Sequence, residues 1–108
     1  PETEWIEAIG ILLDNAIEAS PKGSTIFLSS KKQGDFLELT VSNPAPPLSN
    51  TEFMALFGKG VTTKASRDGH GFGLYNILRM TERYHGKILT RNESILNENY
   101  VVFGILMP

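Results

Sequence analysis

The sequence predicts an α+β fold, a two-layer α/β sandwich in which helices cover one face of a mostly antiparallel, mixed β-sheet. Apolar residues recur at helical spacing in some segments and alternate with polar residues in others. These segments follow the order helix, two strands, loop, helix, two strands, which favours separate helix and strand layers. Crossover connections leave room for some parallel pairing. The 108 residues suit a single domain, 1–108, with one core.

The first half predicts a helix and a β-hairpin. Apolar residues at helical spacing predict a helix over residues 5–17, with Thr3 as its N-cap. The apolar positions of this helix are Trp5, Ile6, Ile9, Leu12, Leu13, Ala16 and Ile17. A Ser-Pro-Lys-Gly segment at 20–23 ends it. Alternating residues then predict strands at 25–31 and 36–41, joined around Gly34.

The second half begins with Asn-Pro-Ala-Pro-Pro at 43–47, which interrupts any strand because proline lacks an N–H donor. A short helix is expected around 51–56. Residues 58–73 hold five glycines and few apolar residues, which predicts a mobile surface loop. A second amphipathic helix then runs to about Tyr84, followed by strands at 86–91 and 100–107. The inward positions of this helix are Leu74, Ile77, Leu78 and Thr81.

Composition excludes several classes of function. Ten basic against twelve acidic residues give a net charge of −2, so no basic surface indicates a nucleic acid polymer as partner. The absence of cysteine excludes disulfides, thiolate metal sites and cysteine nucleophiles. No apolar run approaches the roughly 20 residues that span a bilayer, so we expect no direct membrane contact. The abrupt start at Pro1 indicates a fragment of a longer chain.

A glycine-rich loop runs directly into the second long helix. It reads Gly-His-Gly-Phe-Gly at 69–73, and the helix follows at Leu74. Glycines allow close backbone approach, and the unpaired N–H groups of a first helical turn attract phosphate. The spacing fits neither a Rossmann fingerprint nor a P-loop, the other common phosphate-binding loops. Taken alone, the motif is also compatible with a flexible loop.

A second candidate is Asn15, at the margin of the apolar stripe of the first helix, where Asp14 and Glu18 are expected on the polar side. An asparagine carbonyl oxygen can bind a hard cation such as Mg²⁺, which prefers oxygen ligands. The alternative is a hydrogen-bonded structural residue. Spacing by itself leaves both interpretations open.

These motifs together resemble the GHKL ATPase superfamily, whose Bergerat fold is shared by histidine kinases, gyrase, Hsp90 and MutL. Residues 14–19, Asp-Asn-Ala-Ile-Glu-Ala, resemble the N box. Phe53, Phe57 and Thr-Thr-Lys at 62–64 resemble the F box of histidine kinases, and residues 69–74 resemble their second glycine box. The order and spacing match across nearly the whole chain.

The resemblance implies a role for each motif. It implies that Asn15 binds Mg²⁺ and acts in catalysis, that Lys64 contacts the phosphates, and that residues 58–73 close over ATP as a lid. The residues it implies for phosphate and nucleotide binding are Gly69, Gly71, Phe72, Gly73 and Leu74. It also implies transfer of the γ-phosphate to a histidine on a separate dimeric helical hairpin, with a response regulator as a further partner. The expected location is the cytoplasmic portion of a membrane sensor.

The first glycine box departs from the family pattern. The family has Asp-x-Gly-x-Gly, whose Asp accepts a hydrogen bond from the adenine amino group, whereas residues 43–47 lack both glycines. The side-chain oxygen of Asn43 can still accept that bond, without the assistance of a charge. This departure resembles the branch of histidine kinases that senses secreted peptides in quorum sensing, typified by the accessory-gene-regulator sensor.

Ile11 stands four residues before Asn15, where the hydrolytic members of the superfamily have a glutamate that activates water. An aliphatic side chain cannot take a proton, which favours transfer to a protein side chain over hydrolysis. Two alternatives remain: a kinase of the same fold that phosphorylates serine, and a docking module that has lost nucleotide affinity. The acceptor histidine is expected outside this chain, because His70 lies in the lid and His85 at a helix end.

Overall fold

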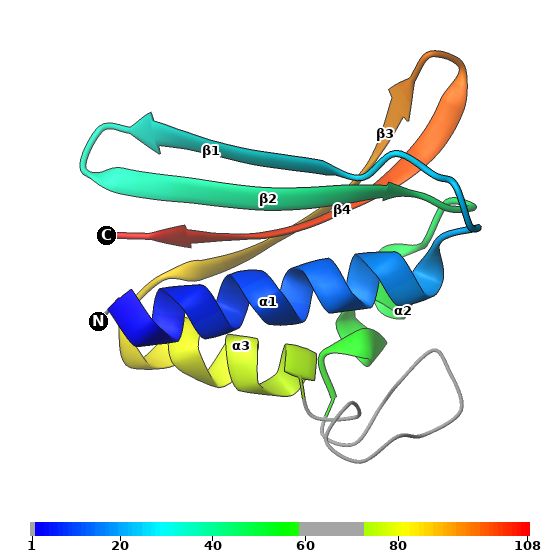
Figure 1. Ribbon diagram of the computed structural model, residues 1–108. Coiled ribbons are helices and arrows are strands. Elements are labelled where there is room, and N and C mark those ends of the chain that lie inside the picture. The colour runs from blue at the N-terminus through cyan, green and yellow to red at the C-terminus, as the bar shows by residue number, and fades with distance from the viewer. Residues whose placement is uncertain (1, 59–72) are drawn as a thin grey trace.

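A computed structural model describes residues 2–58 and 73–108. The elements occur in the order α1 (Glu2–Ala19), β1 (Phe27–Gln33), β2 (Phe36–Pro44), α2 (Asn50–Leu56), α3 (Gly73–Arg83), β3 (Lys87–Ile95) and β4 (Glu98–Met107). The helices lie together on one side of the sheet (Figure 1). The predicted α+β sandwich is confirmed. Among the described helices, none is long and apolar enough to cross a bilayer.

The sheet has the strand order β1-β2-β4-β3, and every pair of described strands is antiparallel. The parallel pairing that we expected in part is therefore not present among these strands. β2 also continues to Pro44, beyond the predicted end at residue 41. Pro44 is tolerated because β1 starts only at Phe27, opposite Ser42, so that β2 has just one neighbour at this point.

The β3–β4 hairpin is longer than predicted. Its strands pair from Lys87 to Ile95 and are joined by a two-residue turn, Leu96-Asn97. Both turn residues have positive φ, 52° and 65°, as the tightest hairpin turns require. This turn brings residues 92–95 and 98–99, which lie between the two predicted strands, into the sheet.

The core lies between the helices and the helix-facing residues of β2 and β4. Leu39 and Val41 alternate along β2 and are paired with Ile105 and Phe103 of β4. Phe103 also contacts α2, with its ring centroid 5.4 Å from that of Phe53. The other buried apolar residues of this cluster are Ala8, Leu12, Ala16, Phe57, Leu74, Ile77, Met80, Val101 and Met107.

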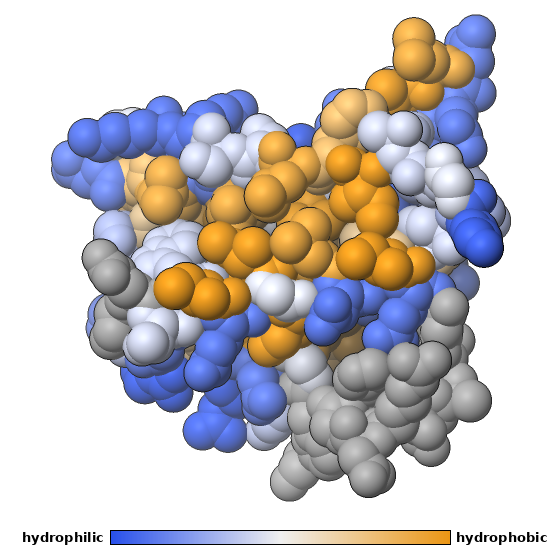
Figure 2. Space-filling model, in the orientation of Figure 1, coloured by the Kyte–Doolittle hydropathy of each residue, from blue (hydrophilic) through white to orange (hydrophobic). Residues whose placement is uncertain are grey.

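Two details of the first helix were predicted incorrectly. α1 already includes Thr3, which is therefore not the N-cap. Ile6 and Ile17 are 67% and 60% exposed, although we placed both on the apolar stripe. α1 packs mainly under β2, which leaves the inner side of β1 open. Figure 2 shows the resulting apolar surface. It is lined by Trp5, Ile6, Ile9, Leu28, Leu37 and Leu39.

Candidate functional site

Three elements bring the candidate residues to one end of the molecule. α1 and β2 run side by side in the same direction, so their last residues lie at the same end (Figure 1). Asn15 occupies the last turns of α1, and Asn43 is the second-last residue of β2. α3 begins at Gly73 against the middle of α1. The fold therefore places Asn43 at the end where α1 finishes, Asn15 one turn before that end, and the start of α3 beside the middle of α1.

Asn43 is buried, with only 1% of its surface exposed. It follows the alternation of Leu39 and Val41 and so faces the helix layer. Its Nδ2 donates to the Pro44 carbonyl oxygen over 3.4 Å, whereas Oδ1 has no hydrogen-bond partner in the described part of the chain. Leaving a buried acceptor unpaired costs about 1–3 kcal/mol. A ligand N–H group would satisfy this oxygen.

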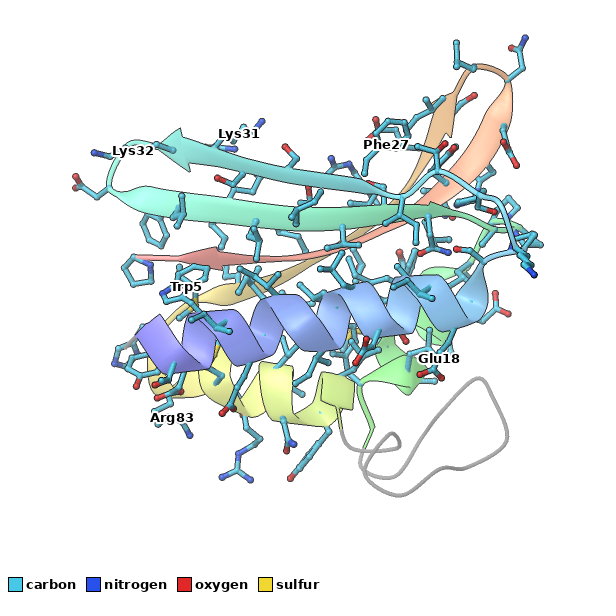
Figure 3. The ribbon with its side chains drawn as sticks, viewed as in Figure 1. Trp5, Glu18, Phe27, Lys31, Lys32 and Arg83 are labelled. Carbon is cyan, nitrogen blue, oxygen red and sulfur yellow. The ribbon has the colours of Figure 1, made fainter. Side chains whose placement is uncertain are left out.

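Asn15 is half-buried, and within residues 2–58 and 73–108 its side chain makes no hydrogen bond. Asp14 is exposed as predicted, but Glu18 is half-buried and points toward α2 in Figure 3. No cluster of three acidic or histidine side chains that could hold a metal occurs in these residues. A cation at Asn15 would therefore need oxygen ligands from a nucleotide or water, as Mg²⁺ commonly has.

Gly73 allows α3 to start close to α1. A Cβ atom at this position would lie 2.9 Å from Cγ2 of Ile11, closer than real side chains approach. Ile11 lies one turn before Asn15, so the contact brings the first N–H groups of α3 near the N-box turn of α1. These groups carry a partial positive charge that suits phosphate. The side chain of Leu74 is buried in the core, which leaves its backbone as the group available to a ligand.

Several predicted residues lie outside the described part of the chain. They are Lys64, Gly69, His70, Gly71 and Phe72, together with residues 59–72 of the predicted lid. His85 is described: it is exposed with φ of 61°, and the next N–H, of Gly86, donates to Thr81 O over 2.7 Å. This hydrogen bond ends α3 with a left-handed residue, so His85 lies at the helix end, as its position in the sequence predicts.

A polar cluster joins α1 and α3 at the opposite end. Arg83 Nη2 lies 2.7 Å from Glu4 Oε2, and the Tyr84 hydroxyl donates to Glu4 Oε1 over 2.7 Å. Figure 3 shows Arg83 reaching from α3 to the start of α1. The hydrogen bond from Tyr84, followed by that from Arg83, lowers the pKa of Glu4. The same bond to Glu4 raises the pKa of Tyr84. The cluster helps to hold the two helices that carry the candidate site.

Comparison with known proteins decides the family. The family model of the GHKL domain matches residues 3–108 of this chain. This chain is a GHKL domain. GHKL domains bind ATP, which agrees with the unpaired acceptor at Asn43 and the helix start at Gly73.

The relatives of this GHKL domain are sensor histidine kinases. It is 33% identical to the sensor histidine kinase CitA of Klebsiella pneumoniae over 107 residues, which are 95% of this chain and 18% of CitA. It is 31% identical to the sensor protein PhoQ of Escherichia coli, over 95% of this chain and 21% of PhoQ. The chain thus spans about a fifth of the length of these relatives.

Solved structures agree with the fold. The catalytic domain of histidine kinase ThkA is 28% identical, with a TM-score of 0.76 over 95% of this chain and 66% of that one. The mycobacterial sensor histidine kinase MprB gives a TM-score of 0.78 at 20% identity, over 94% of this chain and 70% of that one. The predicted membership of the GHKL family and the resemblance to histidine kinases are confirmed.

Two residues near the site were not singled out from the sequence. Asn92 and Asn99 bind the segment that follows Asn43, at Leu48 and Ala45. The predicted strands stopped short of both residues. The signal that could have included them is the Leu96-Asn97 turn, since asparagine tolerates the positive φ of a two-residue hairpin.

Proposed function

We propose that this GHKL domain, residues 1–108, is the Mg·ATP-binding catalytic domain of a sensor histidine kinase. In this role it transfers the γ-phosphate of ATP to a histidine on a separate dimerisation hairpin. The observation that carries the proposal is the buried Oδ1 of Asn43, which is unpaired in the described chain and lies at the end of the molecule where α1 finishes, after its N-box turn. Such an oxygen suits the adenine amino group.

Each site residue has a defined part in the proposal. Asn43 accepts a hydrogen bond from the base, and the backbone at Gly73 and Leu74 binds phosphate, together with Gly69, Gly71 and Phe72. Asn15 supplies a carbonyl oxygen to Mg²⁺, whose charge offsets that of the phosphates. Lys64 adds a positive charge from the lid. Phosphoryl transfer needs little covalent chemistry from the protein, so positioning and charge neutralisation suffice.

Ile11 supports transfer over hydrolysis. Its side chain packs against Gly73, one turn before Asn15, in the place where a water-activating carboxylate would be needed. An aliphatic side chain also keeps water away from this part of the site. The natural acceptor is therefore a histidine presented by another domain.

The proposed partners follow from the same assignment. They are the phosphoacceptor hairpin of the parent dimer and a response regulator, and the proposed location is the cytoplasmic part of a membrane sensor. The combination of Asn43, the prolines after it and the N box at 14–19 supports the quorum-sensing branch that detects secreted peptides, to which the accessory-gene-regulator sensor belongs.

Calorimetry with ADP, with and without Mg²⁺, tests nucleotide binding. We expect wild-type protein to bind ADP, Asn43→Ala to weaken binding in both conditions, and Asn15→Ala to remove mainly the gain from Mg²⁺. Asn97→Gly is the matched control, because Asn97 is exposed in the β3–β4 turn and its positive φ suits glycine. Folded wild-type protein that binds no nucleotide would instead support the docking-module hypothesis.

Labelled ATP tests the transfer step. Alone, the chain should take up almost no phosphate, because His85 is at the C-terminal end of α3, away from the helix start at Gly73. Supplied with the helical hairpin of its parent kinase, it should label a histidine, recognised by its acid-labile phosphate. Acid-stable labelling of serine would favour the serine-kinase alternative, and rapid turnover of ATP by the chain alone would contradict the role assigned to Ile11.

A further inference from the structure

The segment between β2 and α2, residues 45–48, crosses the end of the sheet; we refer to it as the crossing segment. It leaves β2 two residues after Asn43, passes β4 at Asn99, reaches β3 at Asn92 and is followed by Ser49. Ser49 is the N-cap of α2 and forms a capping box with Glu52. The crossing segment therefore joins the candidate base contact to the start of α2.

Few backbone donors are available to hold this segment. Residues 44, 46 and 47 are prolines and have no N–H group. The two remaining N–H groups are both used: Ala45 N–H donates to Asn99 O over 3.1 Å, and Leu48 N–H donates to Asn92 Oδ1 over 3.0 Å. Every N–H of residues 44–48 is thus bound to one of two asparagines.

The carbonyl groups of Ala45 and Leu48 are held by the side chains of the same asparagines. Asn92 Nδ2 donates to Leu48 O over 2.8 Å, so its amide binds both backbone groups of one residue. Asn99 Nδ2 donates to Ala45 O over 2.8 Å and lies 3.4 Å from Asn92 Oδ1. A side-chain amide offers a donor and an acceptor together, whereas aspartate has no donor and alanine has neither.

The register places these contacts beside the candidate base contact. Val101 of β4 pairs with Asn43 on one side and with Asn92 on the other. Residues directly opposite each other in an antiparallel sheet point to the same face, so all three face the helix layer. A shift of the crossing segment would therefore move the end of β2 and change the orientation of the Asn43 side chain.

We propose that Asn92 and Asn99 are positioning residues of the nucleotide site, an inference that rests on the proposed function. They fix the crossing segment, and with it the orientation of Asn43 and the start of α2. Asn92 is exposed, so its hydrogen bonds compete with water and add little to global stability. Its effect is on geometry, and it should appear in the choice of base more than in the free energy of unfolding.

The test compares two substitutions of Asn92 with a control substitution on the same hairpin. Asn92→Asp keeps the shape and the acceptor but loses the donor to Leu48 O, and Asn92→Ala removes both without adding charge. Asn97→Asp adds the same charge in the exposed turn and is the control, since aspartate tolerates positive φ. Calorimetry with Mg²⁺ gives the ratio of the ADP and GDP dissociation constants, and urea unfolding gives stability.

Both Asn92 variants should reduce the preference for ADP over GDP on the order of fivefold to tenfold, the loss expected for one hydrogen bond. Asn97→Asp should leave it unchanged. Loss of stability alone would lower the fraction of binding-competent protein without changing this ratio. If both Asn92 variants keep the wild-type ratio of ADP and GDP dissociation constants while Asn43→Ala loses the discrimination, the inference about Asn92 is overturned and the proposed function stands. Wild-type protein that binds no ADP would overturn the proposed function first.

Discussion

The two ends of the helix-facing side of the sheet differ in chemistry although they belong to the same strands. At one end the paired residues of β2 and β4 are apolar, as in Leu39 with Ile105 and Val41 with Phe103. At the other end the same alternation arrives at Asn43, beside Val101, and then at Asn92. The apolar rows are sealed by α1 and α3, whereas the asparagine row holds a buried oxygen without a partner in the described chain.

This difference means that one end of the sheet mainly stabilises the fold, whereas the other end is suited to bind a ligand. Burial of apolar side chains supplies most of the free energy of folding. The unpaired oxygen of Asn43 reduces it, and such groups are retained where a ligand satisfies them. The two ends should therefore respond to substitution in opposite ways.

The largest effect is expected at the apolar end. Ile105 is 0% exposed, and Ile105→Ala should lower the free energy of unfolding by about 2–5 kcal/mol, because it leaves a cavity between the sheet and the helices. Urea unfolding measures this loss. Leu96→Ala, at a turn residue that is 94% exposed, is the control and should change stability by less than about 0.5 kcal/mol. A changed preference of Ile105→Ala for ADP over GDP would show that the two ends are coupled.

A smaller effect of opposite sign is expected at the polar end. Asn43→Leu keeps the branched shape of the side chain and removes the unpaired oxygen, so the free energy of unfolding should rise by about 1 kcal/mol. Nucleotide binding should be lost at the same time. Thermal melts and calorimetry on one preparation check both. A variant that is clearly less stable would mean that the amide of Asn43 is already satisfied in the protein without ligand.

The parts of this comparison that depend on local pattern were predictable from the sequence. The helical spacing around Leu12, the hairpin at Gly34 and the N-box asparagine all follow from residues close together in the chain. The pairing of Asn43 with Val101 could not be predicted in this way, because strand register depends on contacts between residues far apart in the chain. The exposure of Ile6 could not be predicted for the same reason. Its spacing is that of a buried helix position, but the sheet that faces it ends at the edge strand β1, which leaves the side chain exposed.

The smallest effect concerns the pH dependence of the cluster that joins α1 to α3. Because hydrogen bonds from Tyr84 and Arg83 lower the pKa of Glu4 below its ordinary value of 4.5, the ionised carboxylate stabilises the folded state. This contribution is complete above pH 4.5 and is lost as the pH falls through the lower pKa of the folded protein. The raised pKa of Tyr84, above 10.0, works in the other direction: its contribution is complete below pH 10.0 and is lost as the pH rises through the folded value.

Glu4→Gln should therefore lower the free energy of unfolding near neutral pH, and its difference from wild-type protein should shrink as the pH falls from 4.5 through the lower pKa of Glu4 in the folded protein. The change should be modest, since the cluster is open to solvent and its charges are screened. Glu7→Gln, at an exposed position of the same helix, is the control because it removes a negative charge while leaving the hydrogen bonds of Glu4 in place. Urea unfolding from pH 3 to 8 measures both variants. A constant difference for Glu4→Gln across this range would show that the side chain of Glu4 holds α1 and α3 together by packing rather than by its charge.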